Sequence, residues 1–482
     1  MKALLHIFVL LIGVMLCLGI ASCSDDLDTS AGAQPTPSLD TLRLGTILAG
    51  NSSQTYQLHL YNRHSREIRL SSIALRSDGG SGFRMNVDGM SGTSFTNPDL
   101  LRIAGGDSLF VFVEATFPHT SQGIVHHEDF IDITCNGQQQ SVVLCADSKD
   151  VLKLEGEVLN ADATWPHGLE VQVFDSLVVP EGISLILADS VTLYLHDKAD
   201  IIVRGTLQCL GTQSSPVIIR GDRTDNMFPN LAYDDLPSQW GSLFITDQAK
   251  DCQFVHTDIH GMSQGIVIDS ANVVFNSCRI RNSDGNLITC RMSSMQLLNC
   301  ELANAAGSLL ALYGGWHDIM HCTLANYNFS KQVTSEAVYM CNIDTASVRL
   351  TPLHRATFTN SIVWGSWFNP DVRPDYFRVV IDQDQTGQPV YADSIFTYRF
   401  NHCLLRADGY DDDDFISTLW NEDPLFLLTD RQNYAFDFHL SEGSPALHYG
   451  ASLDTMDIHI PLDLDGNPRK TDSPSLGCYE ME

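Results

Sequence analysis

A short pattern that returns at a fixed interval restricts the possible folds of this chain more than any other feature. The three copies are Cys278-Arg-Ile280-Arg-Asn282, Cys300-Glu-Leu302-Ala-Asn304 and Cys322-Thr-Leu324-Ala-Asn326. The step is 22 residues each time (300 − 278 and 322 − 300). Within each copy the Cys, the Ile or Leu, and the Asn occupy alternate positions, which share one face of a β-strand. We also interpret Cys252-Gln-Phe254-Val-His256 as a degenerate fourth copy.

Each interval between copies holds a glycine turn and two further short apolar runs. A fixed period with alternation inside it is typical of a repeat protein built from β-strands. Three short strands in 22 residues describe one coil of a parallel β-helix. We therefore expect the thiol, aliphatic and amide groups of the copies to point to the axis of the coils.

Cysteine usage favours free thiols. The chain has 13 cysteines, and setting aside Cys17 and Cys23 near the N-terminus leaves eleven, which cannot all pair within one chain. No CxxC and no Cys/His set at zinc spacing is present, so we expect no zinc site. We expect Cys278, Cys300 and Cys322 to form a buried ladder that packs like small hydrophobic side chains.

The N-terminus has the form of an export signal. Lys2 precedes an apolar run from 3 to 20, and Ile20-Ala21-Ser22-Cys23 follows. This tetrapeptide resembles a bacterial lipobox, which implies a signal peptide over 1–22 and a lipid on Cys23. Ser24-Asp25-Asp26 resembles the surface-export signal of Bacteroidota-type lipoproteins, which implies an outer-membrane protein exposed at the cell surface. The alternative is an uncleaved membrane anchor, because the apolar run is nearly long enough to span a bilayer.

The charge balance limits the partners. The chain has 59 Asp and Glu against 28 Lys and Arg, a net charge of −31. Such a surface repels phosphate backbones, so we expect no nucleic-acid partner. It also repels acidic polysaccharides unless a local basic groove or bound cations intervene.

We divide the chain into a tether over 23–38, a β-sandwich over 39–148, a β-helix over 149–430 and a closing segment over 431–482. Short alternating strands between Gly, Asn and Ser turns favour the sandwich. The sequence around 83–87, 103–113 and 117–118 resembles the immunoglobulin-like modules of bacterial surface proteins. The polar stretch 221–239 is expected to loop out of the stack.

Two resemblances concern the β-helix and its end. The order of strands and glycines over 178–245 resembles the right-handed parallel β-helix proteins of the pectate-lyase-like superfamily. The motifs Asp423-Pro-Leu-Phe426, Gly443-Ser-Pro-Ala446, Asp463-Leu-Asp-Gly466 and Leu476-Gly-Cys-Tyr-Glu480 resemble the end of bacterial choice-of-anchor β-helix surface proteins. His448 and Cys478 depart from that pattern. The resemblances imply an all-β fold, a right-handed parallel β-helix preceded by an immunoglobulin-like sandwich.

Candidate catalytic residues are Arg279, Arg281 and Asp284. Pectate-lyase-like enzymes use carboxylates that hold Ca²⁺ and an Arg or Lys base on one strand face, and Asp258 and Asp269 are expected nearby. A guanidinium acts as a base only in a strongly biased environment, so the alternative is a solvated face of paired charges. The paired carboxylates of a glycoside hydrolase cannot be assigned to residues from the sequence.

Asp463, Asp465 and Asn467 have the carboxylate spacing of a calcium loop, but no Glu follows to complete an EF-hand. A turn is the alternative, and no other cofactor is expected. Trp316, Trp364 and Trp367 are candidates for an aromatic strip that stacks on sugar rings, with packing under inserted loops as the alternative.

Two functions remain open. The first is non-catalytic binding of a polysaccharide, or of a host or neighbouring surface protein, in an adhesive role. The alternative is a polysaccharide lyase or glycoside hydrolase acting on the β-helix face.

Overall fold

The computed structural model describes residues 27–481 apart from 122, 229, 329–330, 332, 334, 345–346, 348 and 366–369. Two compact units divide after Asp150, two residues beyond the predicted boundary, and both are all-β. The predicted signal peptide and the lipidation site Cys23 lie outside the described residues. Within the described ranges, no helix has the length and apolar character needed to cross a bilayer.

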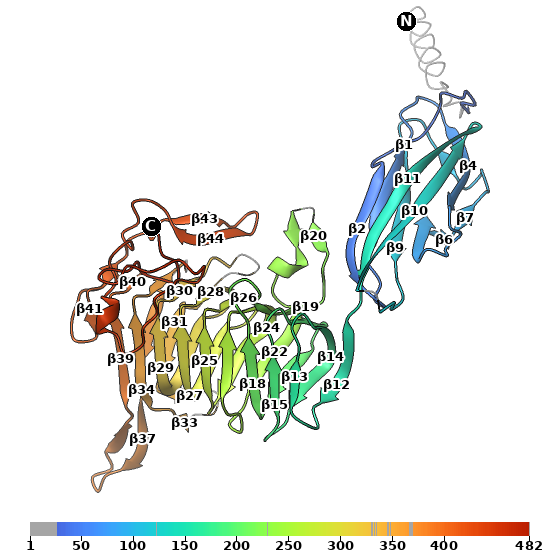
Figure 1. Cartoon of the computed structure of the whole chain (residues 1–482). Helices are drawn as coiled ribbons and strands as arrows, with labels where there is room; N and C mark the ends of the chain where they lie inside the picture. The colour runs from blue at the N-terminus through green and yellow to red at the C-terminus, as the bar shows by residue number, and fades with distance from the viewer. Residues whose placement is uncertain are drawn as a thin grey trace, which may run out of the picture. The chain divides into compact units, whose positions relative to one another are not determined.

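The first unit is a β-sandwich of two sheets (Figure 1). One sheet runs in the order β1 (Thr36–Pro37), β3 (Tyr56–Tyr61), β9 (Ser108–Ala115), β5 (Phe83–Val87) and β6 (Met90–Gly92). The other runs β2 (Thr41–Leu48), β11 (Gln138–Lys149), β10 (Ile124–Cys135), β4 (Ile68–Leu75) and β7 (Ser94–Phe95), and β8 (Arg102–Ile103) also pairs with β4. Alternate residues of both sheets face one core, as in β9, where every second side chain is buried.

The predicted tether over 23–38 is part of the sandwich where the structure describes it. Ala33 is buried in the sandwich core, and Thr36 and Pro37 pair with β3. The side-chain amide of Asn136 donates hydrogen bonds to the carbonyl groups of Asp28, Ser30 and Ala33, each at 3.0 Å. Segment 27–38 therefore belongs to the sandwich, because a side chain from the β10–β11 turn satisfies its backbone.

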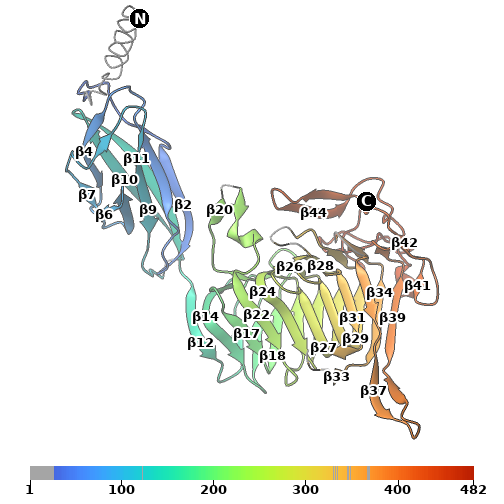
Figure 2. The ribbon, with the colours of Figure 1, turned by 180° about the vertical axis from the view of Figure 1, so that it is seen from behind.

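The second unit is a parallel β-helix whose coils present three faces (Figures 1 and 2). The cysteine face contains β12 (Leu152–Val158), β14 (Glu170–Val179), β16 (Thr192–Leu195), β19 (Val217–Gly221), β24 (Thr257–Asp269), β26 (Arg279–Ser283), β28 (Glu301–Ala305), β30 (Thr323–Ala325), β35 (Ile362–Trp364), β40 (Leu404–Leu405) and β42 (Leu419–Trp420).

The phenylalanine face contains β13 (Ala163–Trp165), β15 (Ser184–Leu187), β18 (Thr206–Leu210), β23 (Cys252–Val255), β25 (Asn272–Asn276), β27 (Ile288–Leu298), β29 (Leu310–Met320), β34 (Leu353–Thr359), β39 (Phe396–Asn401) and β41 (Phe415–Ile416). The third face adds β17 (Asp200–Val203), β22 (Trp240–Ile245), β31 (Val338–Cys341) and β36 (Val372–Asp375) to the long strands β12, β14, β24, β27 and β29, which bend from one face to another.

The predicted ladder is present inside the cysteine face. Arg279 pairs with Glu301 and Glu301 with Thr323, so the three copies stack in register. Their cysteines and the intervening Ile280, Leu302 and Leu324 are fully buried in the core of the coils. Ser361 and Cys403 continue the same position in the next coils, as the longer steps of 39 and 42 residues predicted.

Two details of the predicted repeat are wrong. Cys252 pairs with Val273 on the phenylalanine face, and the residue in register with Cys278 is Thr257. The asparagines do not continue the inward row, because Asn282 and Asn304 adopt positive φ angles of 60° and 57°, which turn the chain at the end of the strand.

Insertions leave the coils as hairpins. The 221–239 insert forms β20 (Asn226–Phe228), β21 (Leu231–Ala232) and the 3-10 helix η1 (Tyr233–Asp235), outside the stack as predicted. Longer rungs carry β32 (Ile343–Asp344) with β33 (Arg349–Leu350), and β37 (Arg378–Gln383) with β38 (Pro389–Asp393).

The closing segment begins earlier than predicted, because its hairpin of β43 (Phe426–Asp430) and β44 (Ala435–Leu440) is separate from the coils; η2 (Leu453–Thr455) follows. Both views show β20 and the β43–β44 hairpin on the same side of the β-helix, with β37 on the opposite side (Figures 1 and 2).

Candidate functional site: a covered charge network and a pocket on the cysteine face

The outer side of the cysteine face is covered by the C-terminal segment. Ala303 and Ala325 on this side pack against Phe438, Leu464 and Tyr479 of that segment. The alternative of a solvated face of paired charges is therefore wrong about the solvent for these coils, although Arg279 and Arg281 are paired with carboxylates. Small side chains on the strands leave room for the aromatic and aliphatic groups of the cover, which are removed from water.

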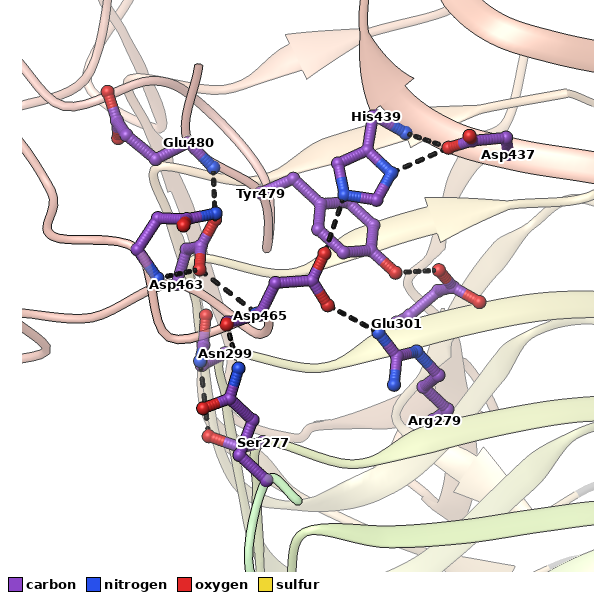
Figure 3. A network of polar contacts seen from close by, with 12 residues as sticks. Ser277, Arg279, Asn299, Glu301, Asp437, His439, Asp463, Asp465, Tyr479 and Glu480 are labelled. Carbon is purple, nitrogen blue, oxygen red and sulfur yellow. Dashed lines mark hydrogen bonds and ion pairs between the residues drawn. The ribbon is translucent and has the colours of Figure 1, made fainter. Parts of the chain in front are cut away.

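The cover and the strands are joined by a polar network (Figure 3). The guanidinium of Arg279 lies 2.7 Å from Asp465, and the ring of His439 lies 2.8 Å from the other carboxylate oxygen of Asp465. His439 also contacts Asp437 at 2.6 Å, and its ring stacks on Tyr479 with centroids 3.8 Å apart. Arg279 from β26 is thus tied to residues almost 200 positions later.

Electrostatics in this network follow from burial and pairing. Burial opposes the charge of His439, yet hydrogen bonds to Asp437 and Asp465 outweigh it and raise its pKa. Burial raises the pKa of Glu301, although the hydroxyl of Tyr479 donates a hydrogen bond to it. Arg279 keeps its charge, because the acidic groups around it outweigh burial and raise its pKa.

A second charged cluster adjoins the first through Arg281. His260 of β24 lies between two carboxylates, 2.8 Å from Asp258 and 2.7 Å from Asp234 of η1. Arg281 contacts the other oxygen of Asp258 at 3.1 Å, and Arg220 contacts Asp234 at 2.9 Å. Burial opposes protonation of His260, but the two carboxylates prevail and raise its pKa. These contacts fasten the 221–239 insert to the face of the β-helix.

A small pocket opens between the insert and the β43–β44 hairpin, with a volume of about 90 Å³. We call it the hairpin pocket. Its lining consists of Asp235 from η1, Arg281, Asn282, Glu301, Ala303 and Asn304 from β26 and β28, and Tyr434, Phe436 and Phe438 from the hairpin. One wall is therefore aromatic, and the floor offers carboxylates, amides and a guanidinium.

The aromatic wall results from strand alternation in β44. Phe436 and Phe438 are two residues apart in β44, so they share one face, and Tyr434, which precedes the strand with a φ of 54°, lines the same pocket. The rings of Phe436 and Phe438 stack with centroids 5.9 Å apart, and Tyr327 packs against both. The wall is thus held by neighbouring rings before any ligand arrives.

Two polar groups of the lining differ in their access to a ligand. The Nε atom of Arg281 is buried and has no hydrogen-bond partner among the described residues. Burial raises the pKa of Asp235, and the nearby guanidinium of Arg281 opposes that shift. Of the two, Asp235 is the group that can accept a hydrogen bond from a ligand in the pocket.

The predicted catalytic residues are only partly brought together. Arg279 and Arg281 share β26, but both are paired with carboxylates and the pKa of each is raised, which opposes a role as base. Asp284 instead contacts Lys331 at 2.6 Å and accepts a hydrogen bond from Ser238. Asp269 pairs in register with Arg291 on the third face, away from this cluster.

The predicted calcium residues do not form one ligand set. The carboxylate of Asp463 accepts hydrogen bonds from the backbone of Asp465, Asn467 and Glu480, which closes a turn. Asp465 points instead to Arg279 and His439. Within the described part of the chain, no group of three or more His, Cys, Asp or Glu is placed to hold a metal ion. The turn interpretation of this motif is the one that the contacts fit.

The predicted tryptophan strip is not assembled. Trp316 lies on the phenylalanine face, is 46% exposed, and stacks on His354 with centroids 4.2 Å apart. Trp364 lies on the cysteine face and packs under the C-terminal segment. Trp367 lies outside the described residues.

Sequence reasoning missed Asp235, Glu301 as a pocket residue, and the aromatic wall. The signal for the wall was present, because Tyr434-Ala-Phe436-Asp-Phe438 alternates aromatic and other residues as a strand face does. Nothing in the sequence indicated that this strand would lie over β26 and β28.

No family model and no curated protein matches the chain. Among solved structures, pectin methylesterase PemA from Erwinia chrysanthemi is 12% identical, with a TM-score of 0.21, over 56% of this chain and 84% of that one. A PapD-like domain of human CEP192 is 8% identical, with a TM-score of 0.17, over 25% of this chain and 86% of that one. The VesB protease of Vibrio cholerae is 12% identical, with a TM-score of 0.18, over 24% of this chain, which spans about a third (32%) of that protein.

Proposed function

We propose that the protein binds glycans through the hairpin pocket without chemical conversion. The observation that supports this most directly is the pairing of an aromatic wall with a floor of carboxylates, amides and a guanidinium. A sugar ring presents an apolar C–H surface and an edge of hydroxyl groups, so it needs both kinds of contact. Pockets with few, fixed polar groups against apolar walls are the usual form of small-molecule sites.

The rigidity of the floor supports binding as well. β26 and β28 are central strands of the cysteine face, hydrogen-bonded on both sides. Asp235 belongs to η1, and the preceding residue Asp234 is held by His260 and Arg220. Groups already fixed in place lose little conformational entropy when a ligand binds.

The test is a glycan array probed with the full chain, followed by titration calorimetry on the strongest ligand. Phe436→Ala removes the middle ring of the wall, and we expect it to weaken binding about tenfold or more, because a stacking contact and its buried area are lost. Trp316→Ala, an exposed aromatic on another face, is the matched control and keeps full affinity. Retention of no glycan, or equal losses in both variants, would contradict the proposal.

We further propose that the chain is a surface lipoprotein of the choice-of-anchor type, attached to the outer membrane through Cys23. The lipobox-like segment and the following acidic residues support this. Labelling of cells with a radioactive fatty acid is expected to mark the protein, and Cys23→Ala is expected to abolish the label. Protease treatment of intact cells then reports surface exposure.

A glycoside hydrolase is the second candidate, favoured by one observation. Asp235 and Glu301 both line the hairpin pocket, and burial raises the pKa of each. Such enzymes use two carboxyl groups, one of which stays protonated to serve as acid. Release of reducing ends from a bound glycan, lost in Glu301→Gln but kept in Trp316→Ala, would establish hydrolysis. Binding with no product would leave the first proposal in place.

A further inference from the structure

The charge around the hairpin pocket restricts the sugar that can enter it. We infer that the pocket takes a single neutral sugar residue, at a chain end or a side branch, and discriminates against uronic acids. This rests on the proposed glycan binding and names its ligand class. The inference follows from three features: the two carboxylates in the lining, the pairing of the guanidinium of Arg281 with Asp258, and the small size of the cavity.

The lining carries more negative than positive charge. Asp235 and Glu301 face the pocket, and Arg281 is the one cation among the described lining residues. The carboxylate of a uronic acid would have to approach these two acids. Like charges at close range in a partly buried site repel strongly, since little water screens them.

Arg281 does not offset this repulsion, because its charge is already engaged. Its terminal nitrogen contacts Asp258 at 3.1 Å, and Asp258 is in turn bonded to His260. Asp258 thus offsets the charge of Arg281, and the Nε atom of Arg281 is buried out of reach of a ligand. The structure therefore lacks, within its described part, a free guanidinium aimed at an anionic ligand in this pocket.

The same groups suit neutral hydroxyls. A hydroxyl both donates and accepts, so it can donate to the carboxylates while its oxygen accepts from a side-chain amide of the lining. Asn282 and Asn304 add amide groups to the floor, near the ends of β26 and β28, where both residues adopt positive φ angles. A neutral ring meets donors and acceptors without bringing a charge of its own.

Size sets the number of residues bound. A volume of about 90 Å³ is well below the several hundred Å³ typical of sites for drug-sized ligands. Phe436 and Phe438 close one side. The cavity thus holds one ring, or the edge of one, and a glycan must present an end or a branch.

The experiment compares matched neutral and acidic ligands on the full chain. Galactotriose and trigalacturonate differ in the carboxyl groups, and both are titrated by calorimetry at fixed salt. We expect the neutral member to bind at least tenfold more tightly. Equal or tighter binding of trigalacturonate would overturn the inference while leaving glycan binding intact. If neither member of this pair, nor of the matched pair of glucose and glucuronic acid oligosaccharides, binds, the proposed function itself fails.

Asp235→Asn tests the charge rather than the shape, because the amide has nearly the same size as the carboxylate. We expect it to reduce the neutral-over-acidic preference at least fivefold. Asp318→Asn, on the phenylalanine face, removes the same charge elsewhere and is expected to leave the preference unchanged. An identical preference in Asp235→Asn and the parent chain would contradict the role assigned to the floor carboxylates. Circular dichroism and melting curves verify that each variant is folded.

Discussion

The inner and outer sides of the cysteine face belong to the same strands but are stabilised by different contacts. Inside, each coil contributes Cys278, Cys300 or Cys322 and then an aliphatic residue, and all of these are fully buried. They stack in register on the same residues of the neighbouring coils. Outside, Arg279 and Glu301 occupy equivalent positions, yet each has its own partner from the C-terminal segment. Periodicity in the sequence therefore reflects packing between neighbouring coils, whereas contacts with a distant segment leave no period.

The largest loss of stability is expected for a substitution on the inner side of the cysteine face. Leu302→Ala removes a fully buried side chain between Ile280 and Leu324 of the neighbouring coils, and we expect a loss of about 3 kcal/mol in the free energy of unfolding. Gln253→Ala, an outward residue of β23, is the control and should change stability by less than about 0.5 kcal/mol. Urea unfolding followed by tryptophan fluorescence measures both. Similar losses in the two variants would contradict the assignment of inner and outer sides.

The stability of the coils is expected to depend on pH because of His317. This residue is fully buried in β29, and its ring donates a hydrogen bond to the carbonyl of Gly314. Burial lowers its pKa to about 4 from the ordinary 6.5. The unfolded chain takes up a proton first, so this contribution is present above about pH 6.5 and is lost as the pH falls towards 4. The expected loss is about 3 kcal/mol.

The control for this prediction is His317→Gln, which cannot titrate. Its stability should depend less on pH between 6.5 and 4 than that of the parent chain. An unchanged slope would show that His317 is not the group that makes the coils sensitive to acid.

A smaller loss of stability is expected for a substitution on the outer side of the cysteine face. Asp465→Asn weakens the contacts to Arg279 and His439, and we expect a loss of about 1 kcal/mol, since both partners are roughly one-third exposed and screened by water. The pH dependence has the opposite sign from that of His317. The pKa of His439 is raised in the folded chain, so its contribution is complete below about pH 6.5 and is lost as the pH rises through the folded value.

Two measurements check this prediction. Melting curves between pH 6 and 9 should show a weaker pH dependence in Asp465→Asn than in the parent chain, and high salt should reduce the difference further. A variant that is less stable but has the same pH dependence would contradict the coupling between Asp465 and His439.

The smallest effect concerns Trp316. Its stacking on His354 is exposed, so Trp316→Ala should cost no more than about 1 kcal/mol. Thermal melting measures this value. A loss as large as that of Leu302→Ala would mean that Trp316 stabilises the coils as an inner residue does.

The coils could be predicted from the sequence because their cause is local and repeated. Cys278, Cys300 and Cys322 recur every 22 residues, and alternation assigns the aliphatic residues to the interior. The same rule failed at Asn282 and Asn304, since it assumes an extended backbone and both residues adopt positive φ. It failed at Cys252 for another reason, because a matching residue type says nothing about which strand of the coil it occupies.

The site was less predictable because its parts come from three separate stretches of chain. Arg281 was a candidate, but as a base on an open face, and its real neighbours Asp235 and Phe436 lie far from it in sequence. Asp465 was a candidate metal ligand. The sequence thus indicated correctly that its carboxylate pairs with a positive charge, but the partners are Arg279 and His439 and not a metal ion. Without knowledge of how the 426–440 hairpin lies over β26 and β28, no pattern could join these residues.

The buried thiols have a practical consequence. All eleven cysteines of the described residues are free and buried. An alkylating reagent can reach a sulfur atom only when the structure around it opens. Brief exposure to such a reagent, followed by peptide mass spectrometry, would therefore report which parts of the sandwich and of the β-helix open and in what order, with no label engineered into the chain.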